Sequence, residues 1–254
     1  MNRVNVLGVG ISVINIPTSV QIIDSWIAEH EKHYVCVTPV SSVMEAQRDE
    51  NFKRIQNNAG LITPDGMPMV WMGRLHGFSE IDRVYGPDLM LAMSELSARK
   101  GYSNFFYGGA EGVPQELGKR LQEKFEGFKT AGAFSPPFRP LTPAEDNQVV
   151  DMINKSGADI LWVGLGAPKQ EVWMSDHRNR LEVPVMIGVG AAFDFHTGRV
   201  KQAPLWMQRC GMEWLFRLSQ EPKRLWRRYL RDNPLFLINI FLQLTGFRKY
   251  PILS

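Results

Sequence analysis

Hydrophobic residues in the first 196 positions alternate between short apolar runs and longer stretches with helical spacing. The runs are rich in Val, Ile, Leu and aromatic residues and end at Gly or Pro, which is typical of buried strands. They predict strands at Val4–Val9, Tyr34–Val37, Leu61–Ile62, Asn104–Tyr107, Ile160–Leu165 and Val185–Val189. The stretches between them predict helices that include Val43–Gln56, Pro87–Arg99, Val113–Phe125, Pro143–Ser156 and Lys169–Arg180.

Several of these strands are apolar throughout, as expected when helices cover both faces of a parallel sheet. We therefore predict an α/β fold for residues 1–196, with a Rossmann-like parallel sheet flanked by helices. Residues 130–142 are rich in Pro and small residues and are predicted to be a loop that joins two halves. The helix after this loop starts at Thr142-Pro143, which combines an N-cap with proline at the first helical position.

The pattern changes after Gly198, because strand-like runs stop and aromatic and basic residues recur at helical spacing. Residues 197–254 are therefore predicted to form a helical appendage to the α/β domain. Their most apolar stretch, Leu235–Leu244, is well short of the roughly 20 residues that a membrane-spanning helix needs. We expect it to lie on a bilayer or to pack on protein.

Charge separates these two parts of the chain. Residues 197–254 contain eleven Lys/Arg and three Asp/Glu, a net charge of +8, so the earlier residues carry −5 of the chain's +3. Basic tails of this kind meet nucleic acid or anionic lipid. Aromatic residues between the cations favour a membrane surface, and the alternative is a solvated helix face with its aromatics in the core. The residues predicted to contact membrane or acceptor are Arg217, Lys223, Arg224, Trp226, Arg227 and Arg228.

Composition narrows the class of protein and the compartment in which it is expected. With 254 residues and 44% hydrophobic residues the chain can bury a core, which excludes a disordered polymer. Cys36 and Cys210 lie far apart and form no CxxC pattern, which favours a reducing cytoplasm. The N-terminal residues are broken by Asn and Gly and predict a first strand instead of a signal peptide.

Ligands of parallel α/β sheets bind at the carboxyl ends of strands, where loops and helix N-termini present free N–H groups. The predicted strand ends are Gly8-Val9-Gly10, Thr38-Pro39, Thr63–Gly66, Gly108–Gly112, Gly164–Glu171 and Gly188–Asp194, and several of these loops are lined by glycine and can converge on one ligand. The first resembles part of a dinucleotide fingerprint, but Val13 replaces its third glycine and Pro17 interrupts the expected helix. A tight turn is the better interpretation there, and no cofactor is expected.

Asp65 lies between Pro64 and Gly66 directly after a predicted strand, which places a carboxylate at the functional edge of the sheet. An inverting glycosyl transfer needs such a group to take the proton of the acceptor hydroxyl as its oxygen attacks the anomeric carbon. The alternative is that Pro-Asp-Gly is only good turn chemistry. Asp65 is the first candidate for the catalytic base.

A departing nucleoside diphosphate needs a metal ion or Arg, Lys and helix N-termini to stabilise it. The sequence has no DxD triplet, and Asp194 with His196 is a weak metal pair, so metal-independent chemistry is expected. Arg83 precedes a helix start and could reach a phosphate, or could pair with Asp82 or Asp88 on the surface. In the loop Gly164–Glu171 two glycines allow close backbone approach, and Gln170 offers an amide to sugar hydroxyls.

Together these residues resemble the WecG/TagA/CpsF glycosyltransferases (glycosyltransferase family 26) over nearly the whole chain. The similarity is carried by Gly164–Glu171, Pro64–Gly66, Arg83–Leu89, Phe106–Gly109, Gly188–Phe195 and Ala203–Arg228. It implies an inverting, metal-independent transfer from a UDP-sugar to a polyprenyl-diphosphate-linked sugar on the cytoplasmic membrane face. The products would be surface polysaccharide or teichoic acid linkage units.

By position, the resemblance implies that Asp65 is the base, that Thr38 is a strand-end residue of the site and that Arg83 faces diphosphate. The arginines of the C-terminal appendage would then help to close the site at the membrane. The implied donor-binding residues are Gly108, Gly109, Gly164, Gly166, Pro168, Lys169, Gln170, Glu171 and Asp194, of which Gln170 would contact the sugar and Asp194 the nucleotide.

One departure concerns the donor sugar. Many members of the family carry Asn shortly after the threonine, where this chain has Thr38 followed by Pro-Val-Ser-Ser. This difference argues against N-acetylmannosamine and leaves glucose or a uronic acid as alternative donors. A homo-oligomer is also left open.

Two alternatives to an enzymatic function remain. A membrane-docked scaffold would use the same glycine loops to bind a nucleotide sugar without catalysis. A nucleic-acid-binding module would use the +8 tail, and it predicts salt-sensitive retention on DNA with none on anionic vesicles.

Overall fold

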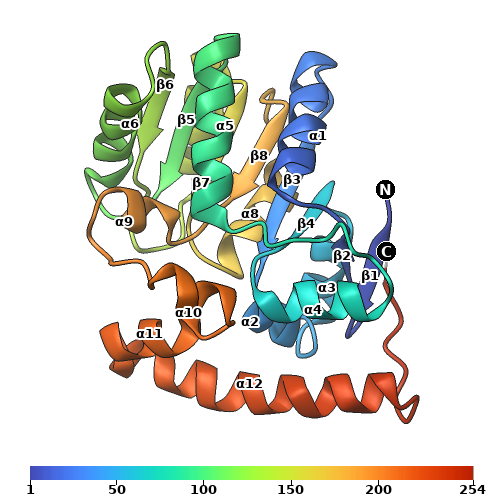
Figure 1. The fold of residues 1–254 in the computed structure, drawn as a ribbon. Coiled ribbons are helices and arrows are strands. Elements are labelled where there is room, and N and C mark those ends of the chain that lie inside the picture. Colours follow the sequence, from blue (N-terminus) through green and yellow to red (C-terminus); the bar gives the residue numbers. More distant parts are fainter. Residues whose placement is uncertain (254) are drawn as a thin grey trace. The chain divides into compact units, whose positions relative to one another are not determined.

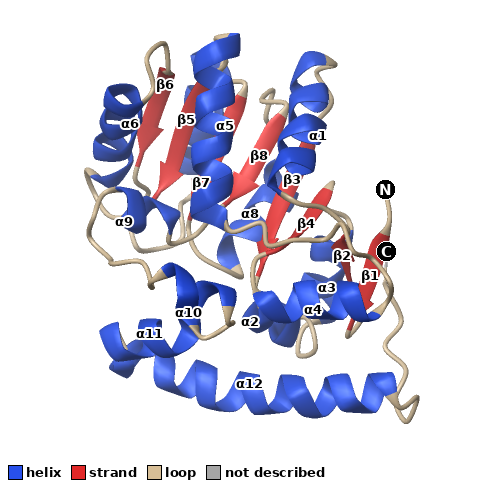
Figure 2. Ribbon diagram, in the orientation of Figure 1, coloured by secondary structure: helices blue, strands red, loops and turns tan. Residues whose placement is uncertain are grey.

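The computed structural model describes residues 1–253, which divide into two compact units (Figure 1). Unit 1 combines Met1–Asn15, Val37–Tyr85 and the chain from Lys201 onward, and unit 2 combines Ile16–Cys36 with Gly86–Val200. Six strands follow the sheet order β4-β3-β8-β7-β5-β6 (Figure 2), which confirms the predicted α/β, Rossmann-like class. Strand β3 begins in unit 2, and its last residues, Val37 and Thr38, belong to unit 1.

Unit 2 holds the main parallel sheet. Its strands are β3 (His33–Thr38), β5 (Ser103–Gly108), β6 (Lys129–Phe134), β7 (Ile160–Gly164) and β8 (Val185–Gly188). Pairings β3–β8, β8–β7, β7–β5 and β5–β6 are all parallel. The helices are α1 (Ile16–Ala28), α5 (Gly86–Lys100), α6 (Val113–Lys124), α7 (Pro143–Ser156), α8 (Lys169–His177) and α9 (Ala192–His196). Helices α1 and α5 contact each other over one face (Figure 1), and α8 packs on β7 and β8.

Unit 1 contains the antiparallel hairpin β1 (Arg3–Val6) and β2 (Val9–Ser12), and strand β4 (Leu61–Pro64). Its helices are α2 (Val40–Glu45), α3 (Glu50–Asn57), α4 (Met67–Leu75), α10 (Leu205–Arg209), α11 (Glu213–Gln220) and α12 (Pro222–Leu244). The predicted C-terminal helices are confirmed as α10–α12, and they belong to the same unit as Met1–Asn15 and Val37–Tyr85. None of the helices in residues 1–253 is long and apolar enough to cross a membrane.

The end of the chain is attached to the hairpin by side-chain amides. Gln243 accepts from the Leu7 N–H at 2.8 Å and donates to the Asn5 carbonyl at 2.8 Å. Asn5 in turn donates to the Tyr250 carbonyl at 2.7 Å, and Asn57 donates to the Leu253 carbonyl at 2.8 Å. Unit 1 is therefore completed by residues from both ends of the sequence.

The predicted strand Val4–Val9 is wrong in its second half. The chain reverses at Leu7 and Gly8, whose φ angles are 52° and 82°, and continues as the antiparallel strand β2. The Asn5 side chain accepts from the Gly8 N–H at 2.7 Å and stabilises this turn. Gly8-Val9-Gly10 therefore belongs to a hairpin and not to the carboxyl edge of the parallel sheet.

Two further predictions need correction. Residues 130–142 are not all loop, because Lys129–Phe134 form β6 at the edge of the sheet, where Gly132 leaves room for the Phe105 ring. The predicted helix Val43–Gln56 is divided into α2 and α3, since Asp49 adopts an extended conformation and caps α3 by accepting from the Phe52 N–H at 3.0 Å. Helices α1 and α4 were not predicted, and their early prolines, Pro17 and Pro68, are tolerated in a first helical turn.

Candidate active site

A pocket of about 480 Å³ lies within unit 1. Its polar and charged lining residues are Ser41, Asp65, Arg83, Tyr85, Gln208, Glu213, Arg217, Arg228, Tyr229 and Asn233. Its apolar lining comes mainly from α4, α11 and α12, with Met67, Pro68, Trp71, Met72, Leu75, Trp214, Phe236, Leu237 and Ile240, and also includes Pro39 and Val40 at the start of α2. This division suits a ligand with a charged head and a hydrocarbon tail.

Asp65 stands at the polar part because β4 ends one residue before it. Its N–H donates to the Thr38 carbonyl at 3.4 Å, and its own carbonyl accepts from Arg83 Nε at 3.0 Å. Gly66, in extended conformation, then caps α4. Thr38 itself is fully buried, so it supports the Asp65 loop and does not line the pocket.

In this structure the Arg83 guanidinium contacts other side chains of the protein. Its guanidinium donates to Gln208 Oε1 at 2.8 Å, pairs with Glu213 and lies 4.0 Å from the centre of the Tyr85 ring. The side chains of Arg83 and Glu213 are each only 14% exposed. The surface pairing with Asp82 considered above is not formed by the guanidinium, since the Arg83 group that donates to Asp82 is its backbone N–H. Arg83 therefore connects the Asp65 loop to α10 and α11.

Tyr85 is kept protonated by its surroundings. Burial raises the pKa of its phenol, the nearby Glu213 and Asp65 carboxylates raise the pKa further, and Arg83 opposes them. The side chain is 5% exposed and lines the pocket. Tyr85 can therefore act as a hydrogen-bond donor beside Asp65 but not as a base.

Two arginines of the appendage reach the pocket. Arg217 and Arg228 both line it, and Arg228 donates to Ser41 Oγ. Burial lowers the pKa of Arg228, Arg217 and Arg224 lower the pKa further by repulsion, and Tyr229 and Asp232 raise it. Two cations that repel each other in a half-buried pocket favour an anionic ligand.

The other predicted appendage residues lie outside this pocket. Lys223, Arg224, Trp226 and Arg227 are exposed along α12. Arg224 pairs with Glu221, and the Arg227 guanidinium lies 5.3 Å from the Trp226 ring centre. These four side chains face solvent in the described structure and are available to a surface.

Replacing Arg83 by Met should lower the free energy of unfolding by about 3 kcal/mol, because Glu213 would keep a buried charge without its cation. Urea denaturation monitored by circular dichroism measures this difference. Arg74→Met is the matched control, since the Arg74 side chain is 50% exposed and its pairing with Asp82 is loose at 3.7 Å; it should cost no more than about 0.5 kcal/mol. Equal losses in the two variants would show that the Arg83 pair does not hold α11.

The predicted donor-binding residues lie in unit 2, at strand ends of its sheet. Gly108, with φ of 121°, stands against Gly164, where an added Cβ would lie 2.6 Å from the Gly164 carbonyl. The Gly109 N–H donates to the Gly164 carbonyl at 3.0 Å, and a Cβ on Gly164 would meet the Phe193 ring at 2.9 Å. The ends of β5 and β7 are thus packed without side chains, which leaves backbone groups at this edge.

Gln170 ties two of these loops together. Its Oε1 accepts from the N–H groups of Gly166 at 3.2 Å and Gly190 at 3.0 Å. Its Nε2 donates to Glu171 Oε1 at 3.0 Å, and both side chains are buried. The amide predicted to meet sugar hydroxyls is therefore engaged in shaping the loops.

The remaining predicted residues of unit 2 surround these loops. Pro168 and Lys169 are exposed at the start of α8. Asp194 lies on the short helix α9, half-buried, and its carbonyl accepts from the Arg199 N–H at 2.9 Å. Within residues 1–253, no three His, Cys, Asp or Glu side chains gather as a group that could hold a metal ion.

Comparison with known proteins gives a consistent result. A family model described as "Glycosyl transferase WecG/TagA/CpsF family" matches residues 4–250. Two similar curated proteins are both named N-acetylglucosaminyldiphosphoundecaprenol N-acetyl-beta-D-mannosaminyltransferase. The one from Bacillus spizizenii is 33% identical over 73% of this chain and 70% of its own length. The one from Bacillus subtilis is 29% identical over 86% of each chain.

Proposed function

Because the chain belongs to the glycosyl transferase WecG/TagA/CpsF family, it is a hexosyltransferase, and we propose that it moves a hexose from a UDP-sugar to a polyprenyl-diphosphate-linked sugar. The observation that carries this proposal is the pocket of unit 1. Asp65 suits an acceptor hydroxyl, Arg217 and Arg228 suit a diphosphate, and the apolar wall suits the first isoprenyl units.

Asp65 acts as the general base in this proposal. It takes the proton of the acceptor hydroxyl while that oxygen forms a bond to the anomeric carbon of the donor sugar. The bond from the anomeric carbon to the UDP oxygen breaks on the opposite face, and UDP leaves with the electron pair, so the anomeric configuration inverts. The charge on UDP is stabilised by protein cations and by backbone N–H groups, and the reaction needs no metal ion.

The donor is proposed to bind the glycine loops of unit 2. The closeness of Gly108 to Gly164 and the bonds of Gln170 preorganise backbone N–H groups that can hold a diphosphate. The names of the two relatives make N-acetylmannosamine the first sugar to test. Its uronic acid, glucose and glucuronic acid are the alternatives that the absence of Asn after Thr38 leaves open.

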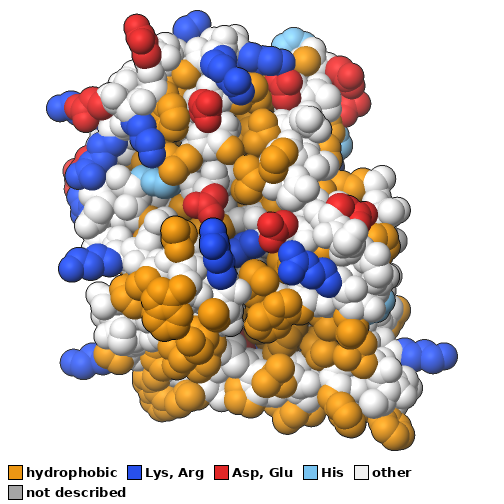
Figure 3. All heavy atoms as spheres, in the orientation of Figure 1, with side chains coloured by type: hydrophobic (Ala, Val, Ile, Leu, Met, Phe, Trp, Pro, Cys, Tyr) orange, Lys and Arg blue, Asp and Glu red, His pale blue; other side chains and the backbone are white. Residues whose placement is uncertain are grey.

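The acceptor lies in a membrane, so we also propose that the protein works as a peripheral protein at the cytoplasmic membrane surface, in assembly of a cell-envelope polymer. Hydrophobic side chains gather over α10–α12 on the face shown in Figure 3. Exposed apolar residues of these helices and the segment after them include Leu205, Trp206, Leu230, Ile238, Phe241 and Phe247. Basic side chains on the same helices would meet anionic headgroups.

A defined transfer assay tests this function. Purified protein is mixed with each candidate UDP-sugar and an N-acetylglucosaminyl diphosphate on a short prenyl chain, and products are identified by mass spectrometry. We expect one added hexose, with release of UDP that requires the acceptor. Tight binding of a UDP-sugar without product in any combination would favour the membrane-docked scaffold instead.

A further inference from the structure

Helix α12 carries one acidic residue among many basic ones. Between Pro222 and Leu244 the cations are Lys223, Arg224, Arg227, Arg228 and Arg231, and the only carboxylate is Asp232. Asp232 is also one of the few buried residues of the helix, at 2% exposure. Burying a carboxylate is costly unless cations and hydrogen bonds compensate it, so its position calls for a partner from outside α12.

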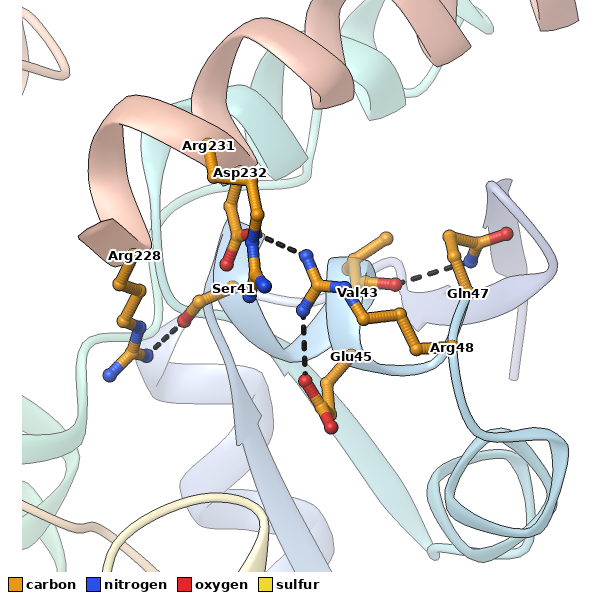
Figure 4. A network of polar contacts seen from close by, with 8 residues as sticks. All are labelled: Ser41, Val43, Glu45, Gln47, Arg48, Arg228, Arg231 and Asp232. Carbon is orange, nitrogen blue, oxygen red and sulfur yellow. Dashed lines mark hydrogen bonds and ion pairs between the residues drawn. The ribbon is translucent and has the colours of Figure 1, made fainter.

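That partner is Arg48, which follows α2. Figure 4 shows the Arg48 guanidinium between two carboxylates, Asp232 on α12 and Glu45 on α2. Arg48 also donates to Glu45 Oε2 at 2.9 Å, and Asp232 accepts a second bond from Arg231 Nε at 3.1 Å. The pair therefore connects the middle of α12 to α2, and the two helices are in contact.

One helical turn earlier, the same face of α12 carries Arg228. Residues four apart lie above one another on a helix, so fixing Asp232 also fixes the direction in which Arg228 extends. Arg228 donates to Ser41 on α2 (Figure 4), and it also lines the pocket that contains Asp65. Helix α2 itself starts just after Thr38, whose carbonyl holds the Asp65 loop.

The charges in the pocket explain why Arg228 needs to be held in position. Arg217 and Arg228 repel each other, and the burial of Arg228 adds a desolvation cost. Both effects favour movement of Arg228 toward solvent. Asp232 opposes this movement in two ways, because it attracts Arg228 and because its pairing with Arg48 holds α12 against α2.

We propose that Asp232, held by Arg48, is a positioning residue for acceptor binding, which keeps Arg228 in the pocket to meet the acceptor diphosphate. This rests on the proposed function, in which the acceptor carries a diphosphate. Asp232 is not among the residues that line the pocket, so its effect on the acceptor would be indirect.

The test is a double-mutant cycle with Asp232→Asn, Arg228→Gln and the combined variant. A short-chain prenyl diphosphate acceptor is used, so that membrane partition plays no part, and KM is measured separately for donor and acceptor. Asp232→Asn should raise the acceptor KM about tenfold, the size expected when a charged hydrogen bond is misplaced, with the donor KM unchanged. Because Asp232 acts through Arg228, the combined variant should be no worse than Arg228→Gln alone.

Two further variants keep the test decisive. Arg48→Gln leaves Asp232 with Arg231 and should reproduce the rise in acceptor KM even if Asp232→Asn does not fold. Glu45→Gln removes only the exposed second partner of Arg48 and should leave both KM values within twofold.

The outcomes separate the two ideas. Additive effects of Asp232→Asn and Arg228→Gln would overturn the positioning role while leaving the acceptor site intact. An unchanged acceptor KM in Arg228→Gln would overturn the assignment of Arg228 to the acceptor and the positioning role with it. Equal rises in donor and acceptor KM, together with a lower melting temperature, would show that Asp232 is purely structural.

Discussion

Asp65→Asn should lower the turnover of sugar transfer by about a hundredfold to ten-thousandfold, the contribution expected of a general base. Asparagine has nearly the same shape, and the backbone bonds of residue 65 to Thr38 and Arg83 do not depend on the carboxylate. The loop should therefore keep its conformation while the proton acceptor is lost. Single-turnover transfer to the short-chain acceptor measures the effect, and calorimetry with UDP should show nearly unchanged binding.

Asp82→Asn is the matched control for this experiment. Asp82 is an exposed carboxylate in the same unit, and its replacement should leave turnover within about twofold. Retained transfer in Asp65→Asn, at more than about a tenth of the wild-type rate, would remove Asp65 from the role of base. The adjacent Glu213 would then be the next carboxylate of the pocket to examine.

Replacing Leu230, Ile238, Phe241 and Leu244 together by Ser should weaken binding to anionic vesicles by about a thousandfold. All four side chains are exposed on α12. If each gains about 1 kcal/mol from partial insertion between headgroups, the sum of about 4 kcal/mol corresponds to that factor. Vesicle co-sedimentation at a series of lipid concentrations measures the change, and the buried Leu225 and Phe236 remain to hold the helix.

A second set of substitutions separates charge from hydrophobic insertion. Lys223, Arg224 and Arg227 are exposed, and changing all three to Gln should reduce binding to anionic vesicles but not to neutral ones. The reduction should be smaller at high salt, because salt screens these charges.

Unchanged co-sedimentation of the four-serine variant would contradict docking through α12. Strong retention of the wild type on DNA, with none on vesicles, would instead support the nucleic-acid reading of the basic tail.

Local patterns predicted most of the fold in unit 2. Strands such as Ile160–Gly164 and Val185–Gly188 are buried along their length, so apolar runs identify them directly. Edge strand β6 escaped prediction because it is only half-buried and contains Ala131 and Gly132, residues with weak strand preference. The β1–β2 turn escaped because its positive φ angles fall on Leu7 as well as Gly8.

The candidate site was predictable where a single loop defines it and not where distant segments meet. Asp65 follows a predicted strand, and in the structure it lines a pocket, while its catalytic role stays a prediction. The pairing of Arg83 with Glu213 joins residues 130 positions apart, and that of Arg48 with Asp232 joins residues 184 apart, so no local spacing reveals either. One indication of the second pair is present in the sequence, because Asp232 is the single acidic residue within the basic helix α12. Tyr85 and Glu213 gave none.

The amide contacts that tie Asn5 and Leu7 to Gln243, and Asn57 to Leu253, have a consequence for biosynthesis. The hairpin is synthesised before unit 2, and the residues that bond to its polar groups are synthesised after unit 2. Contacts between residues this far apart in the sequence form slowly. The sheet of unit 2 should therefore fold before the hairpin makes its bonds to the C-terminal residues. The pocket of unit 1 would therefore form only after α10–α12, which supply part of its lining, have been synthesised and have packed on the earlier segments of the unit.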